Sequence, residues 1–581
     1  MKHWLRPVSK RAIMSVLTAG LTFSFVGLAA GASTAPSSSP QRFGYSSALC
    51  AWLQVHSDKA RGLTCPGSGP TSSDAALNNR AATSNRHNSP LEQSRDAGSR
   101  SEAPSFNGNV DATNYNEDLA SGQSETAIGA LGRYVATAWN DATGFIIADS
   151  TNPQGSLTSV GFSSDGGKSF TDVDLPNDDP CQRIFGDPGV VAYKANGTTY
   201  FYVTSLYLPE FSARCPNGGN YKISLSVGTV SGNAIVFDPH PVVVADGGNF
   251  QNFPISIKGF LDKDFAAIDR SRGKLVVSYT CFGTGGSAAD ACGPSDVEIS
   301  LCTLEDPAHP FCRPPGGTSG PTYMTLATAP PSPAGGLEEL EGAYPAFNPS
   351  GDSYVTWNQN WSTNYFDGDP LTHQMATKVP ASCLNGVPCA AQPIATVEAA
   401  IKSLDTTTIP GYNRGTGQDF PRIAYNKVTN KVVFVWNEGN AHPLGDIVMK
   451  TADPTLASFS AKIRVNDDHS FALHFLPAVS VDASGNTNVS WYDRRNAGGT
   501  AFTDVYAASI GAGEEGGKNV KVTTVATEWN DTGSFSTPNF GDYTDNTSDG
   551  NAFYVSWSDG RIGVPNAFVA SAQTGGGNEG Q

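Results

Sequence analysis

The sequence predicts an all-β chain folded as a β-propeller, with seven blades favoured, six as the alternative, and a disordered segment ahead of it. Three observations predict this fold class. The 581 residues include 62 Gly and 38 Pro but only 16% charged residues, which is typical of turn-rich β proteins. One hairpin pattern recurs seven times after about residue 115. The preceding segment has too few apolar residues to build a core.

The chain begins with the features of a secretory signal peptide, which we assign to residues 1–32. Residues 12–32 carry no charge and end in the small-residue pattern Ala30-Gly31-Ala32. We therefore predict cleavage after Ala32 and a secreted, extracellular mature protein with no membrane association. An uncleaved membrane anchor is the alternative. Residues 33–108 are rich in Ser, Asn, Pro and Gly, and are predicted to form a low-complexity linker. The basic residues that open the chain are Lys2, Arg6, Lys10 and Arg11.

Ten cysteines agree with export, because disulfides persist outside the cytosol. They fall in local pairs along the chain, and pairing of nearest neighbours predicts five short-range disulfides. A zinc site is the rival interpretation, and the absence of any Cys-x-x-Cys spacing disfavours it. The predicted pairs are Cys50–Cys65, Cys181–Cys215, Cys281–Cys292, Cys302–Cys312 and Cys383–Cys389.

Each hairpin copy has a short apolar strand, a turn containing Gly, Asn or Asp, and a second strand that usually ends in an aromatic residue. Seven such hairpins, each followed by more strand-like sequence, indicate propeller blades, and we assign residues 109–581 to this domain. The last copy ends near Ser571, so residues 109–115 are predicted to supply the outer strand that closes the ring. The aligned strand ends are Trp139, Ser205, Tyr279, Trp357, Trp436, Trp491 and Trp557.

One motif after the first hairpin connects the chain to a known superfamily. Residues 163–170 fit the Asp-box pattern S-x-D-x-G-x-[ST]-[WF], a turn in which the Asp accepts backbone N–H bonds. On this motif and the hairpins, residues 117–575 resemble the sialidase-like (BNR/Asp-box repeat) superfamily of secreted β-propellers. The resemblance implies the fold, a glycoside hydrolase activity, and structural roles for Ser163, Asp165, Gly167 and Phe170. The chain lacks the early Arg-Ile-Pro motif of sialidases, so no other residue role is carried over.

The repeat also predicts where a site lies, because inner strands begin and their antiparallel partners end on the same face of a propeller. On this face we predict that Asp187, Asp264, Arg422, Arg494 and Tyr543 form a catalytic site, since they depart from the repeat pattern. His474 is interpreted as structural, with a general base as the alternative. The acidic loop residues Glu338, Glu339 and Glu341 are interpreted as solvated. Residues interpreted as structural are Glu125, Asp141, Asp493, Arg495, Asp559 and Arg561.

The favoured function is a glycoside hydrolase acting on an extracellular glycan. The alternatives are a non-catalytic propeller that binds glycan or protein, and a propeller polysaccharide lyase, which needs a His or Tyr base. The net charge of −17 excludes nucleic acid as a partner, because phosphate binding needs a basic face. Converging carboxylates could hold a calcium ion, and no other cofactor is expected. We expect a monomer.

Overall fold

The computed structural model describes residues 103–574 apart from several connecting segments. The predicted signal peptide, residues 33–102 of the predicted linker, the Cys50–Cys65 pair and His469 lie outside the described residues. The undescribed internal residues are 114–121, 142–155, 210–214, 216–218, 250–257, 284–290, 314–322, 332–336, 361–370, 386–388, 391, 405–418, 443, 469, 471, 498–500, 514–515 and 530–540.

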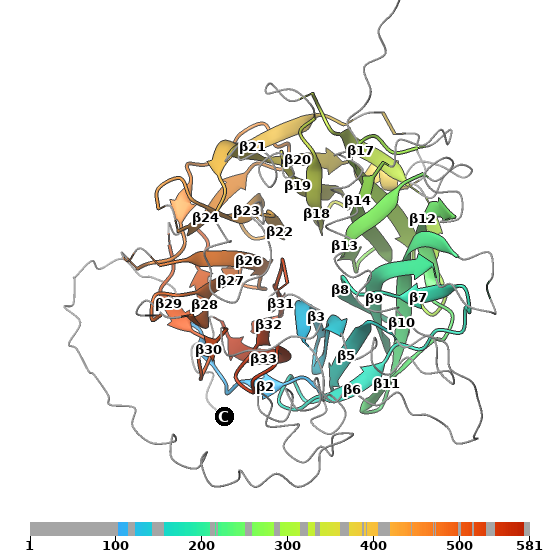
Figure 1. Ribbon diagram of the computed structural model, residues 1–581, viewed down its shortest axis with the longest axis horizontal. Coiled ribbons are helices and arrows are strands. Elements are labelled where there is room, and N and C mark those ends of the chain that lie inside the picture. The colour runs from blue at the N-terminus through green and yellow to red at the C-terminus, as the bar shows by residue number, and fades with distance from the viewer. Residues whose placement is uncertain are drawn as a thin grey trace, which may run out of the picture.

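The described residues form seven antiparallel sheets arranged in a ring, which confirms the seven-bladed propeller and excludes the six-bladed alternative (Figure 1). We call the centre of the ring, where side chains of the inner strands meet, the channel. Blade 1 contains β3 (Gln123–Leu131), β4 (Tyr134–Asp141), β5 (Thr158–Ser163) and β6 (Thr171–Asp174). Blade 2 contains β7 (Gln182–Ile184), β8 (Gly189–Ala195), β9 (Thr198–Pro209), β10 (Asn220–Ser231), β11 (Ala234–Phe237) and β12 (Val242–Asn249). Blade 3 contains β13 (Phe260–Asp269), β14 (Lys274–Phe282), β15 (Asp296–Thr303), β16 (Phe311–Arg313) and β17 (Met324–Thr328).

The second half of the ring repeats this plan. Blade 4 contains β18 (Leu340–Phe347), β19 (Ser353–Gln359), β20 (Leu371–Val379) and β21 (Ile394–Lys402), with the short helix α5 (Ala381–Leu384) between the last two. Blade 5 contains β22 (Arg422–Asn426), β23 (Lys431–Glu438), β24 (Asp446–Ala452) and β25 (Ile463–Arg464). Blade 6 contains β26 (His474–Val481), β27 (Thr487–Asp493), β28 (Phe502–Ile510), β29 (Asn519–Lys521) and β30 (Thr527–Glu528).

Blade 7 is built from both ends of the described chain. It contains β31 (Asp545–Asp549), β32 (Ala552–Asp559) and β33 (Asn566–Gln573), and its outer edge is supplied by β1 (Ser105–Phe106) and β2 (Val110–Asp111). Val110 pairs with Val569, which confirms the predicted closing strand. Pairing also begins earlier than expected, because Ser105 pairs with Gln573. The ring is therefore closed by backbone hydrogen bonds between segments about as far apart in sequence as the domain allows.

The core lies between the blades, and the tryptophans that end the second strands explain the repeat. Five of them are fully buried, Trp139, Trp357, Trp436, Trp491 and Trp557. In four of these blades the indole N–H donates to a carboxylate two residues later, for example from Trp491 to Asp493 at 2.8 Å. A buried indole N–H needs an acceptor, so the recurring Trp-x-acid pattern satisfies it within one strand.

Four disulfides join the described cysteines, in the pairs predicted from their spacing: Cys181–Cys215, Cys281–Cys292, Cys302–Cys312 and Cys383–Cys389. Each closes a loop within one blade. The described residues include no helix with the length and hydropathy needed to cross a bilayer.

The turn from β5 to β6 consists of residues 163–170. The Asp165 carboxylate accepts bonds from the backbone N–H groups of Lys168 and Ser169, each at 3.0 Å, while the Ser163 hydroxyl accepts from the N–H of Gly167 at 2.9 Å. Phe170 packs against a cluster of buried side chains from blades 1 and 7. These contacts are those of a structural turn.

Candidate functional site

The inner strands share an unusual backbone feature at the end that faces the predicted site. In six of the seven blades, a residue near the start of the inner strand has a positive φ. It lies among the first four residues of the strand or up to four residues before it. In four blades the pairing with the second strand slips at this point, which defines a β-bulge that re-aims the side chain. The six positions are Glu125, Asp187, Lys263, Gly342, Leu476 and Gly541.

Three of these left-handed residues are charged, namely Glu125, Asp187 and Lys263. A left-handed backbone costs a non-glycine residue on the order of 1–3 kcal/mol, so such positions often belong to sites whose geometry the fold has to hold. Together with three more acidic residues they form a group at the channel mouth, which we call the mouth cluster. Its members are Glu125, Asp187, Asp262, Lys263, Glu341 and Asp542.

Lys263 lies at the centre of the mouth cluster. Its Nζ is 2.8 Å from a carboxylate oxygen of Asp187 and 3.1 Å from one of Asp542, and all three side chains are at most 10% exposed. Burial by itself would lower the pKa of this ammonium group. The carboxylates of Asp187, Asp542, Asp262 and Glu125 outweigh burial and raise that pKa well above its usual value. Lys263 is therefore a permanent cation.

Asp262 is the member of the cluster that titrates near neutrality. Burial raises the pKa of its carboxyl group to about 7, although Lys263 lowers it. Repulsion from Asp187 and Asp542, and a hydrogen bond with Asp187, favour the protonated form further. A half-protonated acid thus lies beside carboxylates that Lys263 stabilises in their ionised state.

Glu341 and Glu125 complete the cluster from blades 4 and 1. Glu341 is 1% exposed, and burial raises the pKa of its carboxyl group well above normal. Its Oε1 accepts a bond from the Gly342 N–H at 3.1 Å, while its Oε2 has no partner among the described residues. Asn140 donates to Glu125 at 2.8 Å and accepts from the backbone N–H of Asp187 at 2.6 Å, so it links blades 1 and 2.

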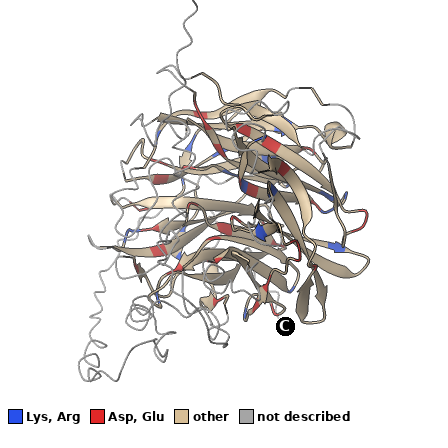
Figure 2. Ribbon diagram, turned by 45° about the vertical axis from the view of Figure 1, so that its right-hand side comes forward, with Lys and Arg blue, Asp and Glu red and all other residues tan. Residues whose placement is uncertain are grey.

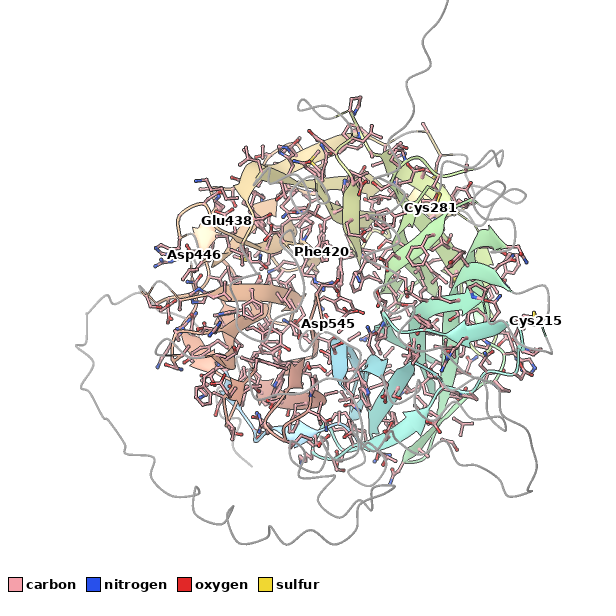
Figure 3. The ribbon with its side chains drawn as sticks, in the orientation of Figure 1. Cys215, Cys281, Phe420, Glu438, Asp446 and Asp545 are labelled. Carbon is pink, nitrogen blue, oxygen red and sulfur yellow. A yellow bond between two sulfur atoms is a disulfide. The ribbon has the colours of Figure 1, made fainter. Side chains whose placement is uncertain are left out.

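Below the mouth, side chains from four blades cross the channel. Arg422 lies 4.6 Å from the ring centres of Phe265 and Tyr344 and 5.4 Å from that of Tyr543. The Tyr344 hydroxyl donates to Asp545 at 3.3 Å. Phe265 and Tyr344 each come two residues after a left-handed position, which places them deeper along the inner strands. We call Phe265, Tyr344, Arg422, Tyr543 and Asp545 the channel floor; Figure 3 shows Asp545 beside the channel.

Four of the five residues of the channel floor are buried, and Tyr344 is partly exposed. Arg422 and Tyr543 are each 2% exposed. Burial raises the pKa of Asp545 to about 6, with Arg422 lowering it, and burial raises the pKa of the Tyr543 hydroxyl well above normal. Cation–π contacts between a buried guanidinium and aromatic rings contribute to stability, so the floor serves as a rigid base for the mouth cluster.

Four of the five predicted site residues come together. Asp187 belongs to the mouth cluster, Arg422 and Tyr543 belong to the channel floor, and Asp264 interacts electrostatically with Asp187 and Asp262. Asp264 is fully buried, and burial raises the pKa of its carboxyl well above normal. The fifth residue, Arg494, belongs to neither the mouth cluster nor the channel floor as these are defined above. It follows β27, its acidic neighbour is Glu528, and burial lowers its pKa.

Sequence reasoning missed several members of the site. Lys263 and Asp262 were not singled out, although both lie in the run Asp262-Lys263-Asp264 at an inner-strand start. Glu125 was interpreted as structural, yet it lies in the mouth cluster. The solvated interpretation of Glu341 was wrong, because that side chain is buried. A polar run at the start of an inner strand was the signal that could have identified these residues.

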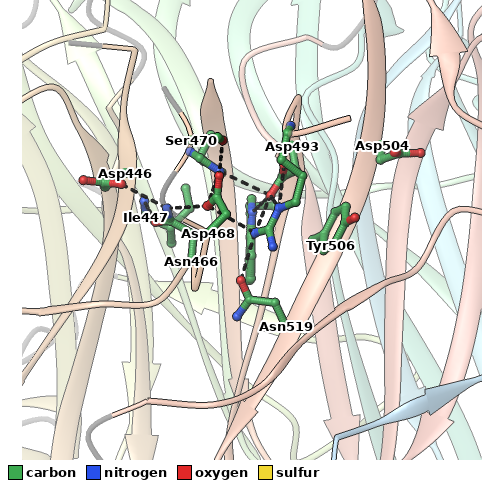
Figure 4. Close-up of polar contacts among 12 residues, drawn as sticks. Asp446, Ile447, Asn466, Asp468, Ser470, Asp493, Asp504, Tyr506 and Asn519 are labelled. Carbon is green, nitrogen blue, oxygen red and sulfur yellow. Dashed lines mark hydrogen bonds and ion pairs between the residues drawn. The ribbon is translucent and has the colours of Figure 1, made fainter. Parts of the chain in front are cut away.

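The residues interpreted as structural at the ends of blades 6 and 7 have the contacts expected of that role. Arg495 binds both carboxylate oxygens of Asp493 at 3.0 Å, and Arg561 binds those of Asp559 at 2.9 and 2.7 Å. Figure 4 shows the network around Asp493, in which Arg495 also contacts Asn519. These bidentate pairs fasten loops to the outside of the sheets.

His474 belongs to the same network and not to the mouth cluster. Its side chain is fully buried, with Nδ1 2.8 Å from the Gly445 carbonyl oxygen and Nε2 3.0 Å from Asp468 and 3.5 Å from Asp493. Burial alone would lower the imidazole pKa, but Asp468 and Asp493 raise it above normal. These surroundings agree with the structural interpretation.

The site offers little room for a resident metal ion. The oxygens of Asp187 and Asp542 that could bind calcium are already close to the Lys263 ammonium, so the mouth cluster does not fit a calcium ion. Elsewhere among the described residues, Cys281, Cys292 and Glu298 have ligand-like spacing. The two sulfurs are joined in a disulfide, which leaves no thiolate to bind a metal.

Comparisons with known proteins identify similar folds but no family. No family profile matches the chain, and no curated protein matches it. A GH93 α-L-arabinofuranosidase of Fusarium graminearum in complex with arabinobiose is 10% identical with a TM-score of 0.39, over 81% of this chain and 98% of that one. Trypanosoma rangeli sialidase in complex with the inhibitor DANA is 12% identical with a TM-score of 0.37, over 70% and 59%. A protein of unknown function from Dyadobacter fermentans is 11% identical with a TM-score of 0.39, over 69% and 97%.

These solved structures match the chain at 10–12% identity and with TM-scores of 0.37 to 0.39. Identity and structural overlap are too low for these proteins to say anything about the activity of this chain. Its function has to be argued from the chemistry of its own site.

Proposed function

We propose that the mouth cluster is the reaction centre of a glycoside hydrolase acting on an extracellular glycan. The observation that carries this proposal is a pair of carboxyl groups in opposite states. Asp262, with a pKa raised to about 7 by burial, retains a proton near neutrality. Asp542 lies 3.1 Å from the ammonium group of the permanent cation Lys263, and we assign it the ionised state on this ion pair. Glycoside hydrolysis needs one carboxyl group of each kind at the scissile bond.

The proposed roles follow from these states. Asp262 donates its proton to the glycosidic oxygen as the bond from that oxygen to the anomeric carbon breaks. Asp542 supplies the carboxylate that attacks the anomeric carbon or takes a proton from the attacking water. Asp187 is a positioning residue, because it raises the pKa of Asp262 by charge repulsion and a hydrogen bond. The four disulfides fit an oxidising, extracellular compartment.

A non-catalytic glycan-binding propeller is the second candidate. Asp187 is paired with Lys263, and Glu125 is hydrogen-bonded to Asn140. Such internal contacts hold polar side chains in fixed positions, as a preorganised binding surface also requires. A polysaccharide lyase has less support, because burial raises the pKa of Tyr543 well above normal and makes it a poor base at neutral pH.

The test is a screen of the purified protein against chromogenic aryl glycosides and polysaccharides, scored by release of chromophore or reducing ends. We expect the wild type to hydrolyse at least one substrate. The rate of hydrolysis should fall at least about 100-fold in Asp262→Asn and stay unchanged in Asp306→Asn. Asp306 is an exposed carboxylate in a turn outside the site and serves as the matched control. Glycan binding without any hydrolysis would leave the second candidate.

A second test concerns the pH profile of whichever substrate is hydrolysed. The rate should fall as pH rises through about 7, where Asp262 loses its proton. Asp187→Asn removes a negative neighbour and should move this alkaline limb to lower pH, which a merely structural role for Asp187 would not do. An alkaline limb unchanged in that variant would contradict the assignment.

A further inference from the structure

We propose, resting on the proposed function, that the mouth cluster accepts uncharged glycans and rejects glycans that carry carboxylate or sulfate groups. The starting point is the balance of charge at the mouth. Five carboxyl groups surround one ammonium group, that of Lys263, which already contacts two of them. Lys263 forms ion pairs with two of the five carboxyl groups, so an arriving anion would meet an excess of acidic groups over cations.

Three of the arginines that the sequence places on this face, Arg422, Arg495 and Arg561, are engaged in other contacts. Arg422 is 2% exposed and lies under the mouth, against three aromatic rings and within 3.5 Å of the Thr544 carbonyl oxygen. Arg495 and Arg561 bind both oxygens of Asp493 and Asp559. Recognition of a sugar carboxylate favours a guanidinium that can offer two parallel N–H groups, and these guanidinium groups are already committed to protein partners.

Acidic residues also outnumber basic ones in four segments of the sequence that lie outside the described residues. Residues 142–155, 361–370, 405–418 and 530–540 together contain one basic residue, Arg414. The same segments contain five acidic residues, Asp149, Asp367, Asp369, Asp405 and Asp531. Over the whole chain, acidic positions outnumber basic ones, and Figure 2 shows both along the strands. The net charge of the chain, −17, therefore has the same sign as the excess of carboxyl groups in the mouth cluster.

Glu341 gives an independent reason to expect a hydroxyl-bearing ligand. Its carboxyl group is buried, interacts electrostatically with Asp262, Lys263 and Asp542, and keeps one oxygen without a partner among the described residues. A sugar hydroxyl can donate to that oxygen when Glu341 is ionised and accept from it when Glu341 is protonated. A sugar carboxylate can only accept, so it would satisfy the oxygen in one of the two states and repel it in the other.

The experiment measures binding separately from hydrolysis. Isothermal titration is performed on the wild type and on Asp262→Asn with matched oligosaccharides that differ only in an acidic group. Suitable pairs are galacturonan oligomers and their neutral methyl esters, and sulfated lactose and lactose. The neutral member of at least one pair should bind at least about 10-fold more tightly than its acidic partner at low salt, and added salt should narrow the difference. Glu341→Gln should also reduce the difference in affinity between the neutral and acidic oligosaccharides, while Asp306→Asn should leave that difference unchanged. Both variants should have the thermal stability of the wild type.

The outcomes separate the two proposals. Acidic oligosaccharides that bind as tightly as their neutral partners, or are hydrolysed in preference to them, overturn this inference and leave the hydrolase proposal standing. Neutral oligosaccharides that bind as expected but are never hydrolysed overturn the hydrolase and support the inference. Failure to bind any neutral oligosaccharide in the panel overturns the inference as well.

Discussion

At the scale of single residues, Lys263 decides the character of the channel mouth. Its ammonium group stabilises Asp187 and Asp542 in their ionised form while Asp262 stays half protonated near pH 7. Removing it would leave buried carboxylates without a counter-charge, which is costly in the protein interior. The same ammonium also occupies the place that a divalent cation would take.

We therefore predict that Lys263→Met lowers the free energy of unfolding by about 3–5 kcal/mol. Millimolar calcium should restore part of the loss in this variant and leave the wild type unaffected, because only the variant offers open carboxylate oxygens. Urea denaturation with and without calcium chloride measures both effects. Lys521→Met is the control, since Lys521 is 38% exposed and pairs with Asp504 at 2.8 Å. An equal calcium response in the wild type would contradict the account.

His474 provides a second residue-scale prediction. Asp468 and Asp493 raise its pKa in the folded state above the ordinary value, despite burial. A group with a raised folded pKa adds stability that is present below its unfolded pKa, about 6.5, and is lost as pH rises through the folded pKa. The difference in unfolding free energy between wild type and His474→Gln should thus shrink from pH 6 to 9 in urea titrations. His240→Gln, which removes an exposed histidine, should give no such trend.

At the scale of elements, the Trp-x-acid pattern gives the second strand of four blades a hydrogen bond between its tryptophan and a carboxylate two residues later. Blade 4 departs from this pattern, because Gln359 follows two residues after Trp357 and the Trp357 indole N–H has no partner among the described residues. Blade 6 retains it, with the Trp491 indole N–H 2.8 Å from Asp493. The two blades form an internal comparison of a tryptophan with and without its hydrogen bond.

Trp491→Phe should therefore destabilise the protein by about 1.5–3 kcal/mol more than Trp357→Phe does, because it also removes a hydrogen bond to a buried carboxylate. Both side chains are fully buried, so the loss of packing is similar. Chemical denaturation of the two variants gives the difference directly. Equal losses would show that packing alone accounts for these tryptophans.

At the scale of the whole molecule, the ring is closed by the N-terminal strands β1 and β2 against β33. Asn109 adds side-chain contacts, accepting from Arg561 at 2.7 Å and from the Thr524 N–H at 2.6 Å. Without these strands β33 becomes an unpaired edge, which invites aggregation.

A chain that starts at residue 114 should accordingly lose its cooperative thermal transition or aggregate, whereas one that starts at residue 103 should unfold like the longer protein. Differential scanning calorimetry and size-exclusion chromatography distinguish these results. A fully stable, monomeric chain lacking residues 103–113 would show that the closing strands are dispensable.

Local pattern was enough to predict the seven hairpins, the closing strand and four disulfide pairs. Hairpins depend on alternation and turn residues that are neighbours in sequence, and the four disulfides close short loops. The face that holds Asp187, Asp264, Arg422 and Tyr543 was also predicted, since it follows from the antiparallel direction of the hairpins. Their catalytic role stays a prediction.

Only the tertiary structure showed that Lys263 is the centre of the site. The position of its side chain depends on a left-handed residue in a β-bulge. The neighbouring sequence does not indicate the direction in which such a bulge turns a side chain. The contacts of Arg422 join blades 3, 4, 5 and 7, whose residues lie far apart in sequence. The sequence by itself determined the repeat and therefore the ring. Which charged residues face one another across the channel depends on the closed ring, because only in the closed ring do the ends of strands far apart in sequence lie close together.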